Sequence, residues 1–119
     1  MSRTTSEIAE EYFRAWKAGD QLAFRALLAD DVDFSGPMAH LNNADECATS
    51  IIRLQTILTD IVPLKRWIDG DNSVSWFELR TSWTEPIPVA NWTHVENGLI
   101  TEIKVVFDQR AFLAGMPQQ

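Results

Sequence analysis

The first third of the chain carries apolar residues at the spacing of α-helices. Thr4 and Glu7 form the pattern of a capping box, in which each side chain satisfies a backbone N–H at the start of a helix. One apolar stripe follows, made of Ile8, Tyr12, Ala15 and Trp16. This stripe predicts a helix that buries one face. Gly19 is placed to end that helix, because glycine readily adopts the left-handed conformation at a helix C-terminus.

A second helix and a short strand are predicted next. Asp20 can cap the second helix, and Asp30-Asp31 ends it. Its buried side consists of Leu22, Ala23, Leu27 and Leu28. The alternation of apolar and polar residues over 32–34 predicts a short strand, which Gly36-Pro37 breaks.

The remainder of the chain holds a third helix and then residues that alternate with a period of two. Asn43, with Glu46 three residues later, signals the start of the helix. Its apolar face carries Cys47, Ile51, Leu54 and Leu58. Strands are predicted at about 62–69, 73–84, 88–96 and 99–109. Pro63 favours an edge strand, or an early position within the strand, for the first of them. Three helices followed by a four-stranded antiparallel meander describe one α+β domain over residues 1–119.

Alternation along these strands separates a charge-free face from a charged one. The charge-free set of the strand at 73–84 is Ser75, Phe77, Leu79, Thr81 and Trp83, and that of the last strand is Ile103, Val105 and Phe107. Burying an unpaired charge costs roughly several kcal/mol, so we expect these sets to face the core and any pocket. Asp33 and Asp108 alternate outward, and Asp108 is a candidate partner of Arg110.

The hairpin over residues 89–108 allows two registers. A three-residue turn with Gly98 in the left-handed region would turn Asn91, Thr93 and Val95 inward. A two-residue Asn97-Gly98 turn would shift the register by one and bring in Ala90, Trp92 and His94 instead. We favour the first register, because it matches Val95 with the apolar strand.

Composition narrows the class of protein. The chain has 119 residues, of which 45% are hydrophobic and 23% charged, as in an ordinary globular domain. Its formal net charge of −7 argues against a nucleic-acid partner, because phosphate binding depends on clustered Lys and Arg. No run approaches the ~18 apolar residues of a membrane span, and the N-terminus lacks an apolar signal region. A cytoplasmic protein without membrane contact is therefore expected.

The order of elements and two segments resemble a known superfamily. The segments are "YFRAWKAGDQLAFRALLADDVDFSGP" and "VENGLITEIKVVFD". They resemble the nuclear transport factor 2-like superfamily, on its SnoaL-like and ketosteroid-isomerase-like side. The resemblance implies a cone-shaped (cystatin-like) fold, in which three N-terminal helices pack on a strongly curved antiparallel sheet around a deep apolar pocket. It does not imply one reaction, since the superfamily contains isomerases, cyclases, dehydratases, epoxide hydrolases and non-catalytic binders.

The resemblance assigns roles to four positions. Tyr12 aligns with the tyrosine by which ketosteroid isomerases donate a hydrogen bond to the developing enolate. Asn91 aligns with their second donor, a protonated aspartate, and with a histidine of SnoaL-type cyclases. Gly36 stands where the isomerases carry their general base, and Val105 where the cyclases and epoxide hydrolases carry an acid/base aspartate. The resemblance therefore implies two neutral hydrogen-bond donors and argues against the ketosteroid isomerase mechanism.

These considerations yield a set of candidate site residues. Ten residues are predicted to bind a ligand: Tyr12, Trp16, Phe34, Met38, His40, Phe77, Thr81, Trp83, Asn91 and Val105. Tyr12, Asn91 and His40 are the candidates for catalysis; histidine is the side chain best suited to accept a proton near neutral pH. Two distant histidines do not predict a zinc site, and no phosphate-binding glycine motif is present, so no metal or cofactor is expected. Cys47, on an apolar helix face, is predicted to be buried and inert.

The outer face of the predicted sheet carries large aromatic side chains. Trp76, Trp92 and His94 would share that face with charged residues, which predicts a homodimer interface. The alternative is that loops or the C-terminal tail cover the tryptophans.

For function, one hypothesis is a pocket protein that isomerises, cyclises or dehydrates an apolar carbonyl compound, with Tyr12 and Asn91 stabilising an oxyanion. The other is a non-catalytic homodimeric ligand-binding or interaction module.

Overall fold

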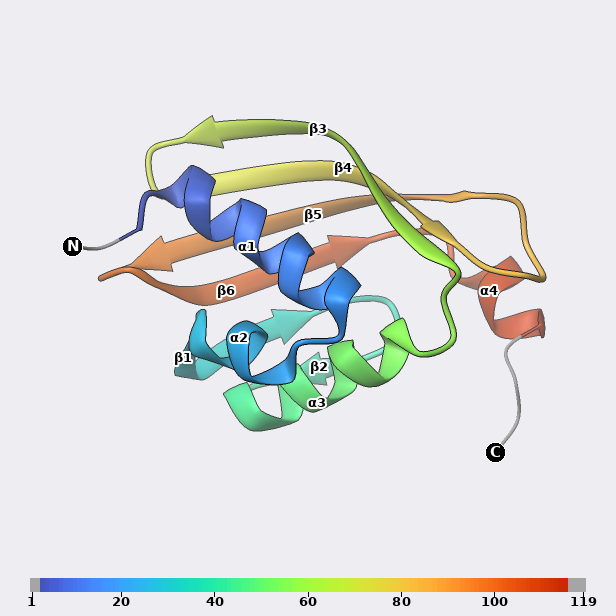
Figure 1. Ribbon diagram of the computed structural model, residues 1–119, viewed down its shortest axis with the longest axis horizontal. Coiled ribbons are helices and arrows are strands. Elements are labelled where there is room, and N and C mark those ends of the chain that lie inside the picture. The colour runs from blue at the N-terminus through green and yellow to red at the C-terminus, as the bar shows by residue number, and fades with distance from the viewer. Residues whose placement is uncertain (1–2, 116–119) are drawn as a thin grey trace.

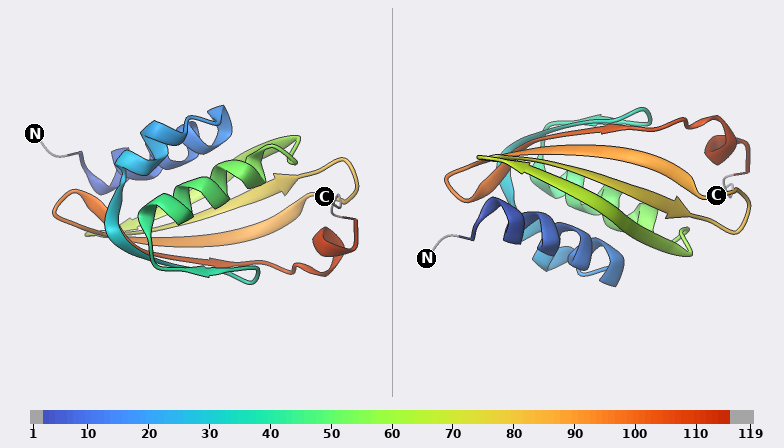
Figure 2. Two further views of the ribbon diagram at one scale, coloured as in Figure 1. Left: turned by 90° about the horizontal axis from the view of Figure 1, so that it is seen from below. Right: turned by 90° about the horizontal axis from the view of Figure 1, so that it is seen from above.

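Three helices of the N-terminal half lie on one face of a single six-stranded sheet (Figure 1). The computed structural model describes residues 3–115. In chain order the elements are α1 (Thr5–Ala18), α2 (Gln21–Ala26), β1 (Leu28–Ser35), β2 (His40–Leu41), α3 (Ala44–Gln55), β3 (Asp60–Asp69), β4 (Asn72–Arg80), β5 (Ile87–Glu96), β6 (Leu99–Val106) and α4 (Arg110–Gly115). Figure 2 shows the sheet curving around α1 and α3, which leaves its other face uncovered by helices.

The predicted helix boundaries are confirmed where a capping side chain marks them. Thr4 and Glu7 form the capping box of α1, and Gly19 ends this helix at a φ of 69°. The side chain of Asp20 accepts a hydrogen bond from a backbone N–H of α2. Asn43 does the same for α3, with its Oδ1 3.1 Å from the backbone nitrogen of Glu46. Each cap satisfies a backbone group that the helix itself leaves without a partner.

The second helix is shorter than predicted, and Leu22, which was expected on its buried side, is 85% exposed. The helix ends at Ala26, and Leu28 already belongs to β1. Leu27 and Leu28 are both buried, which suits a helix stripe and the start of a strand equally well. Pairing across the sheet decides between them, because the backbone N–H of Ile100 donates to the carbonyl of Leu27 and Leu28 pairs with Ile100.

The sheet is mixed rather than purely antiparallel. Its strand order is β2-β1-β6-β5-β4-β3, so the predicted meander is present as β3 to β6. Beyond the meander, β1 adds to β6 in parallel, and the two-residue β2, which the sequence did not predict, pairs with β1. The predicted edge position of Pro63 is confirmed, since β3 lies at one end of the sheet. A parallel partner separated by more than sixty residues leaves no local signal in the sequence.

The core lies between the helices and the inner face of the sheet. The predicted inner residues Ser75, Phe77 and Leu79 are buried. Phe13 and Trp16 of α1 pack edge-on against Phe77, with ring centroids 4.9 and 5.7 Å away. Burying each such aromatic side chain stabilises the fold by roughly 1.5–3 kcal/mol. The packing fixes α1 across the sheet and thereby positions the polar residues that α1 and β5 contribute.

The turn between β5 and β6 differs from the favoured prediction. Glu96 pairs with Leu99, so only Asn97 and Gly98 form the turn. Both have positive φ, 53° and 78°, as a two-residue turn of type I′ requires. The expectation of a three-residue turn is therefore wrong.

The predicted faces of the hairpin are nevertheless confirmed. Asn91 and Thr93 are buried on the inner side, and Trp92 lies on the opposite side. A β-bulge reconciles this outcome with the short turn: Val95 pairs with Ile100, while His94 pairs with Glu102. The bulge inserts one residue into β6 and so shifts the faces by one position.

The end of β4 and the C-terminal segment also differ from the prediction. β4 stops at Arg80, and the Thr81 hydroxyl accepts hydrogen bonds from the backbone N–H groups of residues 83 and 84. This local side-chain bonding competes with the strand ladder. Trp83 turns toward α4, where its Nε1 donates to the carbonyl of Phe112 at 3.0 Å. Asp108 pairs with Arg110 as predicted, which lowers the pKa of that carboxyl to about 2.

Within residues 3–115, no helix is long and apolar enough to cross a membrane.

Candidate functional site

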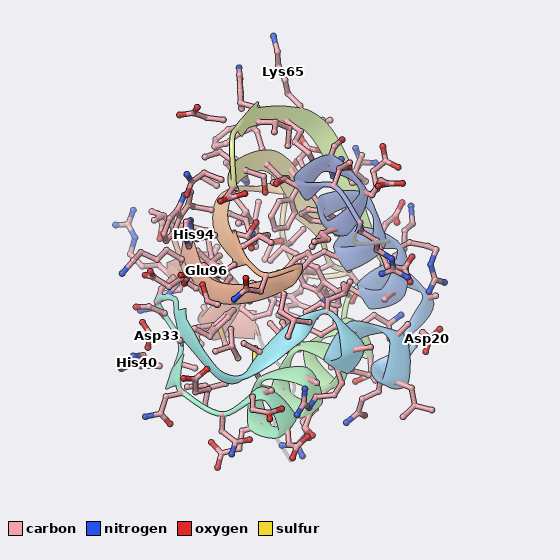
Figure 3. The ribbon with its side chains drawn as sticks, turned by 90° about the vertical axis from the view of Figure 1, so that its left-hand side faces the viewer. Asp20, Asp33, His40, Lys65, His94 and Glu96 are labelled. Carbon is pink, nitrogen blue, oxygen red and sulfur yellow. The ribbon has the colours of Figure 1, made fainter. Side chains whose placement is uncertain are left out.

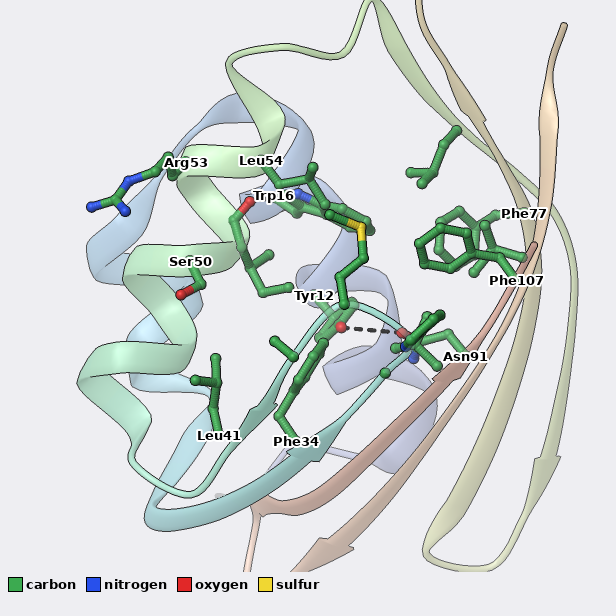
Figure 4. Close-up of a pocket in the computed structure, with 18 of the residues that line it drawn as sticks. Tyr12, Trp16, Phe34, Leu41, Ser50, Arg53, Leu54, Phe77, Asn91 and Phe107 are labelled. Carbon is green, nitrogen blue, oxygen red and sulfur yellow. Dashed lines mark hydrogen bonds between the residues drawn. The ribbon is translucent and has the colours of Figure 1, made fainter. Parts of the chain in front are cut away.

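A cavity of about 250 Å³ opens between α1, α3, the segment after β1 and the inner face of the sheet (Figure 4). Its wall is mostly aliphatic and aromatic. The lining residues are Tyr12, Trp16, Phe34, Gly36, Pro37, Met38, Ala39, Leu41, Ser50, Ile51, Arg53, Leu54, Ile57, Phe77, Leu79, Val89, Asn91, Val105 and Phe107. A concave apolar space with few polar groups is typical of a small-molecule site.

A hydrogen bond between Tyr12 and Asn91 supplies the polar feature of the cavity. The Tyr12 hydroxyl donates to Oδ1 of Asn91 at 3.2 Å, joining α1 to β5 across 79 residues of sequence. Tyr12 is only 1% exposed, and this burial raises its pKa well above its ordinary range. Asn91 is only 2% exposed. The phenol therefore stays protonated at neutral pH and acts as a donor rather than as a base.

The amide nitrogen of Asn91 is free to contact a ligand. None of the described residues accepts a hydrogen bond from it, although every enclosed side-chain nitrogen and oxygen among residues 3–115 has a partner. This amide nitrogen therefore faces open space, which at this position is the cavity that Asn91 lines. Figure 4 shows the pair from the side, with the Tyr12 hydroxyl directed at Asn91.

Proton-transfer groups are missing from the described wall. Arg53 and Ser50 of α3 border the cavity, but Figure 4 shows both polar ends directed away from Asn91. Cys47 is buried as predicted and lies outside the lining, and burial raises the pKa of its thiol to about 12. Among residues 3–115, no carboxylate or imidazole belongs to the lining of this cavity.

The structure brings together seven of the ten predicted ligand residues. These are Tyr12, Trp16, Phe34, Met38, Phe77, Asn91 and Val105. Trp16 is oriented by its Nε1, which donates to the carbonyl of Ile51 on α3 at 3.0 Å. The polar end of the Trp16 ring is thereby occupied, and its apolar part is left for the cavity.

His40 does not reach the cavity. It belongs to β2 and pairs with Ser35, so its side chain lies on the outer side of the sheet, opposite to that of Leu41. Its Nε2 is 2.7 Å from Oδ1 of Asp33, and Figure 3 shows the two side chains together at the surface. Both side chains are substantially exposed. The prediction of a general base at the pocket mouth fails because residue 40 continues the strand alternation instead of lying in a loop.

Thr81 and Trp83 also lie outside the lining. Both were assigned to the inner face on the assumption that β4 continues through residue 84. The strand ends at Arg80, so the alternation stops applying there. Trp83 instead covers Phe112, with ring centroids 5.5 Å apart.

Gly36 and Val105 form an apolar corner of the cavity. A Cβ added to Gly36 would lie 3.6 Å from Cβ of Val105 and 3.5 Å from Cε1 of Phe34, which is ordinary van der Waals contact. Glycine is therefore not required there by packing. A methyl group would fit at residue 36.

Several lining residues were not predicted as ligand contacts. Ile51 and Leu54 were placed on the buried stripe of α3, and this stripe forms both core and cavity wall. Phe107 was placed on the inner face of the last strand and continues that face beyond β6. The 36–39 segment carried only a turn signal. These residues line the cavity because α3 stands apart from the sheet there. The spacing of residues along the chain does not reveal that distance.

The described part of the chain holds no group of three or more His, Cys, Asp or Glu side chains close enough to bind a metal ion.

Comparisons with known proteins agree with this architecture. A family model described as the SnoaL-like domain matches residues 9–103. No sequence match is found among curated proteins.

Solved structures with the same fold share little sequence with the chain. An NTF2-like protein of unknown function from Cytophaga hutchinsonii is 21% identical, with a TM-score of 0.82 over 95% of this chain and 97% of its own. An epoxide hydrolase from M. tuberculosis, described as LEH-like, is 19% identical, with a TM-score of 0.76 over 94% and 88%. A hypothetical protein with a ketosteroid isomerase-like fold from Catenulispora acidiphila, in complex with trimethylamine, is 19% identical, with a TM-score of 0.77 over 96% of both chains. At this identity the likeness concerns the fold alone.

Proposed function

The chain belongs to the family of SnoaL-like domains, and we propose that its cavity binds a small, mostly apolar molecule without acid–base catalysis of its own. The observation that carries this proposal is the composition of the wall, which joins apolar side chains to the neutral pair Tyr12 and Asn91. The cavity, of about 250 Å³, is large enough to hold a small organic ligand. Affinity would come from apolar burial, and orientation from the polar pair.

Isomerisation, cyclisation or dehydration each require a group that accepts a proton within hydrogen-bond reach of the substrate. None of the described lining side chains can do so at neutral pH. The tyrosine is held protonated by burial. Asn91 is an amide, and the corner formed by Gly36 and Val105 has no carboxylate. The wall thus supports the binding module over the enzyme.

Native mass spectrometry of the purified protein tests the proposal. We expect a small molecule to remain bound under gentle ionisation, or to be regained on incubation with cell extract, and to be lost from a variant whose cavity is filled by Val105→Trp. Assays with a ketosteroid substrate should show turnover at the background rate. Efficient turnover would contradict the proposed absence of catalysis, and a protein that never retains a ligand would contradict binding.

We also propose that the protein forms a homodimer through the outer face of the sheet. Trp76 is 41% exposed and Val106 is 69% exposed on that face, while Trp92 is half-buried beside His94. Apolar side chains of this size on an uncovered sheet are typical of an interface. Charged residues of both signs surround them, and a two-fold axis can place each charge beside its opposite.

Sedimentation velocity of the variant Trp76→Ser with Trp92→Ser tests the homodimer. We expect the sedimentation coefficient to fall toward that of a monomer. Leu22→Ser is the matched control, because Leu22 is 85% exposed on α2 and far from the sheet face. Wild-type protein that sediments as a monomer at micromolar concentration would refute the interface.

A further inference from the structure

We propose that the cavity selects a neutral, compact molecule with one hydrogen-bond acceptor, and that the amide nitrogen of Asn91, rather than the Tyr12 hydroxyl, donates to that acceptor. A ketone, lactone or cyclic ether has the required chemistry. This inference rests on the proposed function, because it specifies the ligand of the same cavity. It makes Tyr12 a positioning residue and leaves Asn91 as the contact.

The count of donors supports this assignment. A tyrosine hydroxyl has a single proton, and that of Tyr12 is used on Oδ1 of Asn91. The same bond orients the amide, since an amide that receives a proton on its oxygen must direct its two N–H bonds elsewhere. The nitrogen lines the cavity without a partner among the described residues. The polar feature therefore presents N–H donors to the ligand.

Charge restricts the ligand to a neutral molecule. Arg53, the only cationic side chain among the described lining residues, is exposed and directed away from Asn91 (Figure 4). The chain as a whole carries a formal net charge of −7. A carboxylate inside the cavity would lose its hydration without gaining a cationic partner, which is strongly unfavourable. A cationic ligand would in turn meet no carboxylate in the lining.

Volume restricts the ligand to about two fused rings. A dry cavity of roughly 150 Å³ holds benzene in a well-studied lysozyme variant, and scaling from that case gives about ten non-hydrogen atoms for this cavity. The cavity measures about 250 Å³. A four-ring steroid exceeds this size and would leave part of its skeleton outside.

Four probe compounds separate these requirements. Tetralone is a bicyclic ketone of the expected size, tetralin lacks its oxygen, tetralin carboxylate adds a negative charge, and androstenedione is a four-ring diketone. Binding to the purified protein is measured at pH 7 by titration calorimetry. The variants are Tyr12→Phe, and Tyr12→Phe combined with Asn91→Leu, which removes the amide without leaving a buried hydroxyl unpaired. Circular dichroism and the Tm confirm that each variant folds.

We expect wild type to bind tetralone and tetralin and to bind the carboxylate at least about a hundredfold more weakly. The double variant should keep its affinity for tetralin and bind tetralone about tenfold more weakly, since a buried carbonyl loses its donor. Tyr12→Phe alone should weaken tetralone binding less than the double variant does, because the amide N–H groups of Asn91 remain although the bond that orients them is lost.

Three results would overturn the inference while leaving ligand binding intact. They are an equal loss of tetralone affinity in Tyr12→Phe and the double variant, an unchanged tetralone affinity in the double variant, and tighter binding of the carboxylate or of androstenedione than of tetralone. Failure of wild type to bind any of the four compounds would instead contradict the proposed function itself.

Discussion

Replacing Asn91 by aspartate tests the environment of the cavity with a change of almost no volume. The amide is 2% exposed, and its one hydrogen bond in the described structure comes from Tyr12 at 3.2 Å. The introduced carboxyl would lie among Phe77, Val89 and Val105. Burial in such surroundings favours the uncharged acid and raises its pKa, whereas the tyrosine proton favours the charged form.

The expected cost follows from the size of that rise. Full burial raises the pKa of a carboxyl by up to about three to five units. Because the Tyr12 hydroxyl would donate a hydrogen bond to the charged form, we expect a rise of about three units for the carboxyl of the Asn91→Asp variant. The acid form is native-like, so the variant should match wild type in stability below about pH 4, where the unfolded chain is also protonated. As the pH rises, ionisation is easier in the unfolded chain, and stability falls by about 1.4 kcal/mol per pH unit. The loss of unfolding free energy should level off at about 4 kcal/mol above pH 7.

Urea denaturation at pH 4, 5.5, 7 and 8.5, followed by tryptophan fluorescence, measures this loss as the difference from wild type at each pH. Asn42→Asp is the control, because Asn42 is exposed and outside the cavity. Its difference should stay within about 0.5 kcal/mol throughout. A flat difference for Asn91→Asp, equal to the control, would show that the side chain is hydrated and would refute the apolar site.

Three further predictions concern other parts of the structure. Cys47 should resist alkylation at pH 8 until the protein unfolds, because burial raises its pKa to about 12; rapid labelling of native protein, measured by mass spectrometry, would contradict this. Gly115→Ala should destabilise the protein by about 1–3 kcal/mol in urea denaturation, because the added Cβ clashes with Trp83. Gly36→Ala should cost less than about 1 kcal/mol, and equal costs for the two variants would refute the packing of Trp83 against Gly115. Thr4→Ala should cost about 1 kcal/mol through loss of the capping box, visible as a lower Tm.

Local chemistry determined where the three N-terminal helices begin. The caps at Thr4, Asp20 and Asn43 act through side chains and backbone groups only three residues apart, so their spacing is readable in the sequence. The period of two along β4 and β5 likewise predicted their inner faces, because strand geometry turns successive side chains to opposite sides. Family membership was also accessible, since it depends on the order of these elements and on their apolar pattern.

The hairpin of β5 and β6 marks the limit of such reasoning. The Asn97-Gly98 turn obeyed its local preference for two residues, while the burial of Asn91 required a bulge further along β6. The sequence contained one indication of the bulge: Ile100 and Ile103 are both apolar and both buried although they are three residues apart in one strand. Neither rule alone gives the register, which depends on how both strands fit the helices.

The sequence by itself determined that Tyr12 and Asn91 are polar residues in otherwise apolar patterns, and that carboxylates are missing at Gly36 and Val105. Only the tertiary structure decided that the Tyr12 proton goes to Asn91, that the amide nitrogen faces the cavity, and that His40 lies outside it. The physical reason is that a hydrogen bond between α1 and β5 depends on packing across 79 residues, whereas caps, turns and alternation depend on near neighbours along the chain.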